Sequence, residues 1–350
     1  MADDPNSHAA STNPASATAS GGAVQPPAPG LLARAARWLV TTVFVLSLLL
    51  NVGMFTLYSS FLTPEHGPAE VHHSGNRHAD DKLAIIHVNG VIMPPFSSRV
   101  IKAIKKAKDD KHVKGVLLSI DSPGGTVTDS HQIYHELKKL AGKKPIVVSM
   151  GSIAASGGYF VAMGAGPETR IFAEPTTWTG SIGVIIPHYE VSDAANRLGI
   201  KAAPLKTGEF KDSLSPFREL TTRDKELWDN ILNQSFELFL EVIDENRNTL
   251  DMPKVRALAT GQIYTSRDAK QNGMIDEIGF EEDALEALKK VAATTDVNVI
   301  SYQFPADNLW DALLGSARAN DPAAQWRAIL ELAAPRAMYY FSAGLPAARE

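Results

Sequence analysis

Hydrophobic and polar positions divide the chain into a long apolar segment near its N-terminus and a body in which apolar runs alternate with amphipathic ones. The apolar segment extends from Trp38 to about Leu62 without a charged residue, which is enough to cross a hydrocarbon core of about 30 Å. It also exceeds the roughly 7 to 15 apolar residues of a cleaved signal peptide. We therefore predict an uncleaved transmembrane anchor over residues 34–63, after a disordered polar tail over residues 1–33.

Charges on either side of the anchor predict its orientation. Arg34 and Arg37 precede the apolar segment, whereas Glu65 and Glu70 follow it. Because basic residues favour the cytoplasmic side, we expect a single-pass protein of the cell membrane with a cytoplasmic N-terminus and an extracytoplasmic body, in contact with membrane lipid. Residues 64–82 are rich in His, Pro, Gly and acidic residues, and without regular ligand spacing they are interpreted as a solvated linker rather than a metal site.

From Leu83 onward the pattern predicts alternating strands and helices. Apolar runs over residues 113–120 and 145–150 predict two buried strands with an amphipathic helix between them. Strands that are apolar on both faces are typical of a mostly parallel sheet covered by helices on both sides, so the predicted fold class is α/β. We also expect a short strand over residues 182–186 and a long amphipathic helix over residues 222–247.

Residues 303–350 form a separate amphipathic extension in this interpretation. Apolar residues recur at helical spacing in two stripes before the run Met338-Tyr339-Tyr340-Phe341. Segments of this kind lie on a membrane surface, pack on a neighbouring subunit or pack as ordinary helices, and the pattern leaves these alternatives open.

Composition excludes several classes of protein. The chain has no cysteine, which excludes a disulfide framework, a zinc–thiolate site and a cysteine nucleophile. The formal net charge of -5 and the lack of a concentrated basic face give no reason to expect nucleic acid as a partner. Covalent catalysis in this chain must therefore use an oxygen or nitrogen nucleophile.

The candidate nucleophile is Ser156, in the stretch Ala154-Ala-Ser-Gly-Gly158 directly after the second apolar run. A serine at the turn from a buried strand into a helix has its hydroxyl among free backbone N–H groups. The alternative is a tight packing corner, in which small residues only let a strand and a helix approach closely. A second turn, Asp121-Ser-Pro-Gly-Gly125, ends the preceding strand, and its N–H groups together with that of Gly157 could bind an oxyanion.

A serine nucleophile needs a base within hydrogen-bond reach. After Ser156 the only histidine in the sequence is His188, and a Ser-His-Asp site built on it is one option. A lysine whose pKa is lowered by burial is the other option. Lys206 and Lys211 lie in the same polar loop after the predicted sheet, and composition does not choose between them.

Several motifs, taken in chain order, resemble the bacterial signal peptide peptidase A family, also called protease IV. Its members are membrane-anchored serine-lysine peptidases of the Clp protease and crotonase fold group. The resemblance covers residues 83–302 and implies a crotonase-like βαβ superhelix domain behind one anchor. The motifs are Asp121-Ser-Pro-Gly-Gly125, Ala154-Ala-Ser-Gly-Gly-Tyr159, Thr179-Gly-Ser-Ile-Gly-Val184, Lys211-Asp212 with Ser215-Pro216, and Gly261-Gln-Ile-Tyr264 leading to Gly273-Met-Ile-Asp276.

The resemblance assigns the chemistry residue by residue. It implies that Ser156 is the nucleophile, that Lys211 is the general base, and that Ser181 orients the lysine amine. Gly125 and Gly157 would supply the oxyanion N–H groups, and no metal or organic cofactor is implied. The expected reaction is hydrolysis of hydrophobic peptides, such as signal-peptide remnants left in the membrane.

The resemblance also implies an assembly. The short separation of Ser156 and Lys211 fits the members with a single repeat rather than the duplicated form. Single-repeat members resemble rings or domes of eight chains, in which the lysine reaches the serine of an adjacent subunit. Two other functions stay open. One is a membrane protease of the same fold group, of the stomatin-partner type, and the other is a noncatalytic membrane scaffold.

Overall fold

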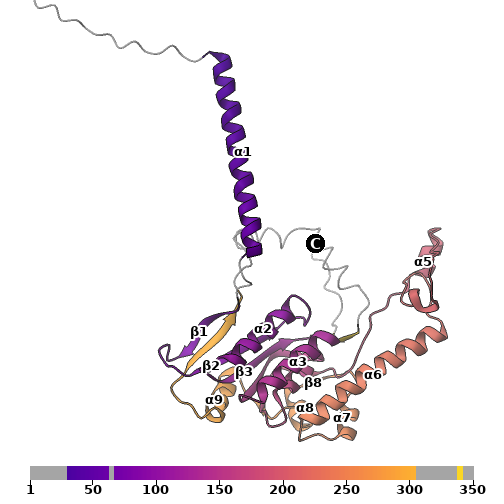
Figure 1. Cartoon of the computed structure of the whole chain (residues 1–350). Helices are drawn as coiled ribbons and strands as arrows, with labels where there is room; N and C mark the ends of the chain where they lie inside the picture. Colours follow the sequence, from indigo (N-terminus) through magenta and orange to yellow (C-terminus); the bar gives the residue numbers. More distant parts are fainter. Residues whose placement is uncertain (1–29, 63–66, 305–336, 342–350) are drawn as a thin grey trace, which may run out of the picture. The chain divides into compact units, whose positions relative to one another are not determined.

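The structure, a computed structural model, describes residues 30–62, 67–304 and 337–341. The chain divides into two compact units, residues 1–64 and 65–350. In the described part of the first unit, helix α1 (Leu31–Leu62) contains a span from Arg34 to Phe55 with a mean hydropathy of 2.0 and none of its apolar window buried (Figure 1). Its length and composition are those of a membrane-crossing helix, as predicted. Most of the predicted disordered tail lies outside the described residues.

The second unit is built on a sheet that has nine strands among the described residues and whose neighbours are mostly parallel. Antiparallel pairs occur between β1 and β10 and between β7 and β8. The strands along the sheet are β1 (Ala69–Gly75), β10 (Asn298–Gln303), β2 (Lys82–Asn89), β3 (Val113–Ser122), β5 (Ile146–Ala155), β6 (Ile171–Ala173) and β9 (Glu277–Ile278), with β7 (Trp178–Gly180) beside β5 and β8 (Ile263–Thr265) beside β7. The predicted α/β class and mostly parallel sheet are confirmed.

Helices cover both faces of this sheet, and Figure 1 shows α2 and α3 side by side. The helices in chain order are α2 (Phe96–Asp109), α3 (Val127–Ala141), α4 (Gly157–Ala162), α5 (Ser192–Arg197), α6 (Thr222–Asn246), α7 (Met252–Leu258), α8 (Ser266–Gln271) and α9 (Glu281–Val291). Successive residues of β2 point to opposite faces, so Ile86 belongs to the core that includes α2 and α3, whereas Ile85 packs in a second core with Leu288 of α9.

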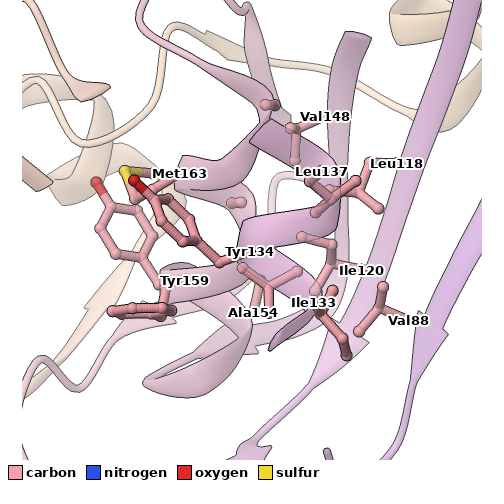
Figure 2. Close-up of a cluster of buried hydrophobic side chains, with 14 of the residues drawn as sticks. Val88, Leu118, Ile120, Ile133, Tyr134, Leu137, Val148, Ala154, Tyr159 and Met163 are labelled. Atoms are coloured by element: carbon pink, nitrogen blue, oxygen red, sulfur yellow. The ribbon is translucent and has the colours of Figure 1, made fainter. Parts of the chain in front are cut away.

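Figure 2 shows part of the larger core. Ile133 and Leu137 of α3 lie over Leu118 and Ile120 of β3, and all four side chains are completely buried. Burying one side chain of this size contributes about 1.5 to 3 kcal/mol. The strands therefore need apolar residues on both faces, which explains the continuous apolar runs of the sequence.

The stretch expected as a solvated linker contains a strand. Residues 69–75 form β1, which pairs with β10 from Ala69 opposite Gln303 to Gly75 opposite Asn298. His72 Nδ1 and the Asn298 side-chain oxygen also share a hydrogen bond of 2.8 Å. β1 is polar and largely exposed, so its pairing partner, more than two hundred residues away, was not visible in the local pattern.

A second difference concerns residues 182–186, which do not form the expected strand. Ile185 makes an isolated antiparallel bridge, and its partner is Met338 near the C-terminal end of the chain. The two apolar stripes predicted for the C-terminal extension lie outside the described residues, so their arrangement stays a prediction.

Polar groups hold both ends of the 25-residue helix α6. At its start, Thr221 and Asp224 form a capping box in which each side chain accepts a hydrogen bond from the other's backbone N–H. At its end, the buried Arg247 donates two hydrogen bonds of 3.0 Å to Asp276. Asp276 also accepts a bond of 2.7 Å from the N–H of Ile171, so this end of α6 is joined to β6.

We expect Arg247→Met to lower the free energy of unfolding by about 3 kcal/mol, because it removes the buried guanidinium that pairs with the partly exposed Asp276 and that also donates to the Gly273 carbonyl. Arg256→Met is the matched control, since Arg256 pairs with Glu237 at the surface, where an ion pair contributes about 1 kcal/mol or less. Urea unfolding followed by tryptophan fluorescence measures both variants. Equal losses would contradict the role given to Arg247.

Candidate active site

Ser156 lies between the last residue of β5 and the first residue of α4, with a positive φ of 53° and ψ of -113°. A non-glycine residue in such a sparsely populated conformation stores about 1–3 kcal/mol of strain. The turn is held because the Ser156 N–H donates to the Gly180 carbonyl at 2.7 Å and the Phe160 N–H donates to the Ser156 carbonyl at 2.9 Å. Its buried hydroxyl has no hydrogen-bond partner among the described residues. This is the geometry that a serine nucleophile needs.

Ser181 occupies the corresponding position after the neighbouring strand. β5 and β7 are parallel with Ala155 opposite Gly180, so Ser156 and Ser181 are the next residues of the two strands. Ser181 also has a positive φ, 49°, and its N–H donates to the Gln262 carbonyl at 2.7 Å. Since paired strands lie about 4.8 Å apart, the structure brings the two serines together at the carboxyl ends of these adjacent strands.

The glycine turn after β3 packs directly against the turn at Ser156. Gly124 begins β4 (Gly124–Thr126), and a Cβ atom on it would lie 2.7 Å from the backbone nitrogen of Gly157. A Cβ atom on Gly157 would lie 3.1 Å from the Cα atom of Gly124. No side chain fits between the two turns, so glycine is required where they meet. Ser122 Oγ fixes this arrangement by accepting a bond of 3.1 Å from the Gly124 N–H.

A short strand from the C-terminal end of the chain lies against the glycine turn. β11 (Met338–Tyr340) pairs antiparallel with β4, and Tyr339 stands opposite Gly125. On the other side of β11, Met338 and Ile185 exchange two backbone hydrogen bonds of 2.9 and 3.0 Å. The groove between β4 and the segment around Ile185 is therefore filled by an extended peptide.

Lys211 is exposed on a short turn, residues 209–213, which we term the lysine turn. Its neighbour Asp212 accepts hydrogen bonds from Lys206 at 2.7 Å and from Arg218 at 3.0 Å, and these two cations lower the pKa of the Asp212 carboxyl. Lys206 is thus engaged in an ion pair. The described residues provide no hydrogen bond or ion pair for the Lys211 amine.

The lysine turn and the turn at Ser156 are tied to different parts of α6. The lysine turn is held to α6 by Trp228, whose Nε1 donates to Ser213 Oγ at 3.0 Å. α6 contacts α4 three turns later, where the rings of Phe239 and Phe160 lie 5.1 Å apart. At 1.5 Å per residue these two contacts are about 16 Å apart along the helix. The structure brings Ser156, Ser181 and the glycines together, but it does not bring the lysine to them within one chain.

No histidine among the described residues is bonded to the Ser156 hydroxyl. His188 Nε2 is buried without a hydrogen-bond partner among the described residues, as is the Ser156 hydroxyl, so the two are not bonded to each other. His131 packs against the ring of Phe160 at 6.0 Å, and burial lowers its pKa. A Ser-His-Asp arrangement is not formed in the described part of the chain.

Sequence reasoning missed two groups at this site. Ser130 of α3 is completely buried, its hydroxyl has no partner among the described residues, and a Cβ on Gly157 would lie 2.6 Å from it. A small polar residue on a helix gave no signal of this position. Tyr339 is the second group. The aromatic run around it is typical of a strand, but the helical spacing of the apolar residues that precede it in the C-terminal extension led to a helical interpretation of the whole segment.

Comparisons with known proteins agree with the fold. The profile of peptidase family S49 matches residues 138–295, and that of Clp protease matches residues 77–193. An Enterococcus faecium protein that carries the name signal peptide peptidase SppA is 34% identical over 277 residues, which cover 75% of this chain and 77% of that protein. A Synechocystis protein named as a protease is 38% identical over 203 residues, 58% of this chain and 72% of its own length.

A longer relative matches in part. Protease 4 of Haemophilus influenzae is 32% identical over 241 residues, which are 65% of this chain but 38% of that protein. The Clp protease-like α/β fold expected from the motifs is confirmed by these matches. The roles of the individual site residues are not decided by them.

The Arg218 guanidinium, together with Thr221, holds the pKa of the buried Asp224 carboxyl well below its usual range. A carboxyl whose pKa is lowered by folding stabilises the folded state at pH values above its pKa in the unfolded chain, about 3.9. This contribution is lost as the pH falls toward the lower pKa of the folded state. We therefore expect Asp224→Asn to destabilise the protein at pH 7 and the difference to shrink below about pH 4. Thermal unfolding at a series of pH values measures this, with the exposed Asp229→Asn on the same helix as control. A difference that stays constant to acid pH would contradict the assignment.

Proposed function

Because the chain belongs to peptidase family S49, the family of signal peptide peptidase A, and is thus a serine peptidase, we propose that it hydrolyses hydrophobic peptides with Ser156 as nucleophile and Lys211 as general base. The observation that carries this proposal is the turn at Ser156. A strained backbone presents a buried hydroxyl, without a hydrogen-bond partner in the part of the chain that the structure describes, next to Ser181 and to Gly157.

The mechanism follows from what these groups can do. The neutral Lys211 amine takes the proton of the Ser156 hydroxyl as the oxygen attacks the peptide carbonyl carbon, and the Ser181 hydroxyl orients the amine. The N–H groups of Gly125 and Gly157 stabilise the oxyanion. The lysinium then protonates the leaving amine, an ester with Ser156 remains, and water activated by the same lysine releases the second product.

In this proposal the lysine comes from a neighbouring copy of the chain. The separation along α6 supports this, and so do apolar side chains that stand exposed along residues 185–217, among them Leu198, Ile200 and Leu205. Contiguous exposed apolar side chains mark interaction surfaces. Two copies joined through this segment would bury Lys211 of one copy beside Ser156 of the next. The number of eight chains rests on the family resemblance.

A groove with mixed polar and apolar walls lies beside Ser181. It has a volume of about 310 Å³, and its apolar side chains include Ile182, Leu232 and Phe236, whereas Asn233 and Thr260 are polar. We propose that the apolar part of this groove receives an apolar side chain of the substrate. Helix α1 would hold the enzyme in the membrane with its catalytic unit on the extracytoplasmic side. Signal-peptide remnants, which are apolar and remain in the membrane, meet both conditions, and the name of the Enterococcus relative supports the same substrate class.

We expect Ser156→Ala and Lys211→Ala each to lower kcat on a quenched apolar peptide by about 1000-fold or more, because each removes a group that takes part in bond making. Lys206→Ala is the matched control and should retain kcat within about 10-fold, since its amine is already paired with Asp212. The detergent-solubilised full chain is assayed. An inert native chain would favour the scaffold function. If only Lys206→Ala lost activity, the base would be Lys206 rather than Lys211.

Mixing the two inactive variants tests whether the lysine acts across subunits. Co-expressed Ser156→Ala and Lys211→Ala chains should regain roughly a quarter of native activity, because random neighbours in a ring pair an intact serine with an intact lysine at that frequency. No recovery in a mixed oligomer would contradict the shared site. Profiling of the native enzyme on signal peptides and on other membrane peptides distinguishes this peptidase from the stomatin-partner type.

A further inference from the structure

We propose that the Ser130 hydroxyl is a third donor to the oxyanion of the reaction, beside the N–H groups of Gly125 and Gly157. The proposal rests on the proposed function, because it adds a catalytic residue to that same reaction. It concerns a buried hydroxyl of α3 that belongs to none of the sequence motifs and that the mechanism above does not use.

The Ser130 side chain is completely buried, and its hydroxyl has no hydrogen-bond partner among the described residues. A serine inside a helix can donate to the carbonyl four residues earlier, and a buried hydroxyl that lacks any partner lowers the stability of the fold. Alanine would fill the same helical position without that cost. We therefore look for the partner of this hydroxyl in a bound ligand.

Polar contacts at the start of α3 fix the position of Ser130. Thr126 caps the helix, and its Oγ1 accepts a hydrogen bond of 3.1 Å from the Asp129 N–H. The Asp129 carboxylate in turn accepts hydrogen bonds from the hydroxyls of Thr126 and of Ser97 in α2. Because β4, which contains Gly125, leads directly into this turn, the glycine turn and Ser130 are held together.

Ser130 Oγ lies against Gly157, where α3 contacts α4. A Cβ atom on Gly157 would lie 2.6 Å from this oxygen. Since a Cβ atom is about 2.5 Å from the nitrogen of its own residue, Ser130 Oγ is no more than about 5 Å from the Gly157 nitrogen. This separation allows one oxygen atom to accept hydrogen bonds of about 2.9 Å from both groups. The carbonyl oxygen of Tyr339 lies 3.0 Å from the same Cβ position, so this side of Gly157 admits a carbonyl oxygen.

The reaction supplies an acceptor for this hydroxyl. When Ser156 Oγ bonds to the substrate carbonyl carbon, the electron pair of the C=O double bond moves to the oxygen, which becomes an oxyanion. Hydrogen bonds to an ionised acceptor are about twice as strong as those between neutral groups, so a donor here binds the transition state more tightly than the substrate. Ser130 keeps its proton and forms no covalent bond. Its fixed hydroxyl needs no reorganisation at the moment when the charge develops.

Two buried serines provide a matched test in the detergent-solubilised full chain. Ser130→Ala should lower kcat on a quenched apolar peptide at least 10-fold and leave KM within about 3-fold, because only transition-state binding is lost. Its Tm should equal or exceed that of the native chain, since the substitution removes a hydroxyl that has no partner in the described fold.

Ser266 is the control, because it is almost completely buried and its hydroxyl donates to the Pro175 carbonyl at 2.8 Å. Ser266→Ala should lower the Tm by about 2 to 4 °C, since it removes this hydrogen bond, and should keep kcat within about 2-fold. The two variants thus separate a hydroxyl that acts in the reaction from one that stabilises the fold.

A transition-state analogue isolates the oxyanion from the other steps. A peptide aldehyde forms a tetrahedral adduct with the serine, so its inhibition constant should rise at least 10-fold in Ser130→Ala. In the Ser156→Ala background, which forms no adduct, a fluorescent form of the same apolar peptide should bind within about 3-fold whether or not the Ser130 hydroxyl is present.

Several results would overturn the role of Ser130 as an oxyanion donor. They are native kcat in Ser130→Ala, an unchanged aldehyde inhibition constant, a raised KM at native kcat, and a fall in Tm as large as that of Ser266→Ala, which would mark a structural hydroxyl. A native chain that does not hydrolyse the peptide, or that keeps its activity in Ser156→Ala, would overturn the proposed function and this role with it.

Discussion

The positive φ of Ser156 is the constraint on which the site depends. A buried parallel strand must end at this residue and a helix must begin at the next, so the serine cannot relax without moving β5 or α4. Its N–H is bonded to Gly180, which couples the turn to β7 and places Ser181 beside it. The glycine turn of β4 can approach because neither Gly124 nor Gly157 carries a side chain. Backbone groups, rather than long side chains, therefore build most of this site.

Helix α6 relates this turn to the rest of the proposed machinery. Phe239 packs on Phe160 of α4 and so orients the helix that begins after the nucleophile. The other end of α6 holds the lysine turn through Asp224 and Arg218. The length of this helix separates its contact with α4 from its contact with the lysine turn. In the proposed assembly, a lysine from a neighbouring copy would complete the site without any change of fold.

The contact between β11 and β4 joins the C-terminal end of the described chain to the glycine turn. The backbone of β11 pairs with β4, and the ring of Tyr339 packs against Phe160 and Phe239. This short strand thus links the aromatic part of the core to the turn beside Ser156.

The sequence by itself determined the membrane-spanning length of α1, the α/β class, and the positions of Ser156 and the glycine turns. Apolar periodicity, runs of small residues and the absence of cysteine can be observed in the sequence directly, without knowledge of which distant residues pair in the fold. The tertiary structure decided the pairing of β1 with β10 and of β11 with β4, because such pairs join residues that are far apart in the chain and, for β1, polar. It also decided that Lys211 lies away from Ser156 in one chain, since a distance along a folded helix is not encoded in any single motif.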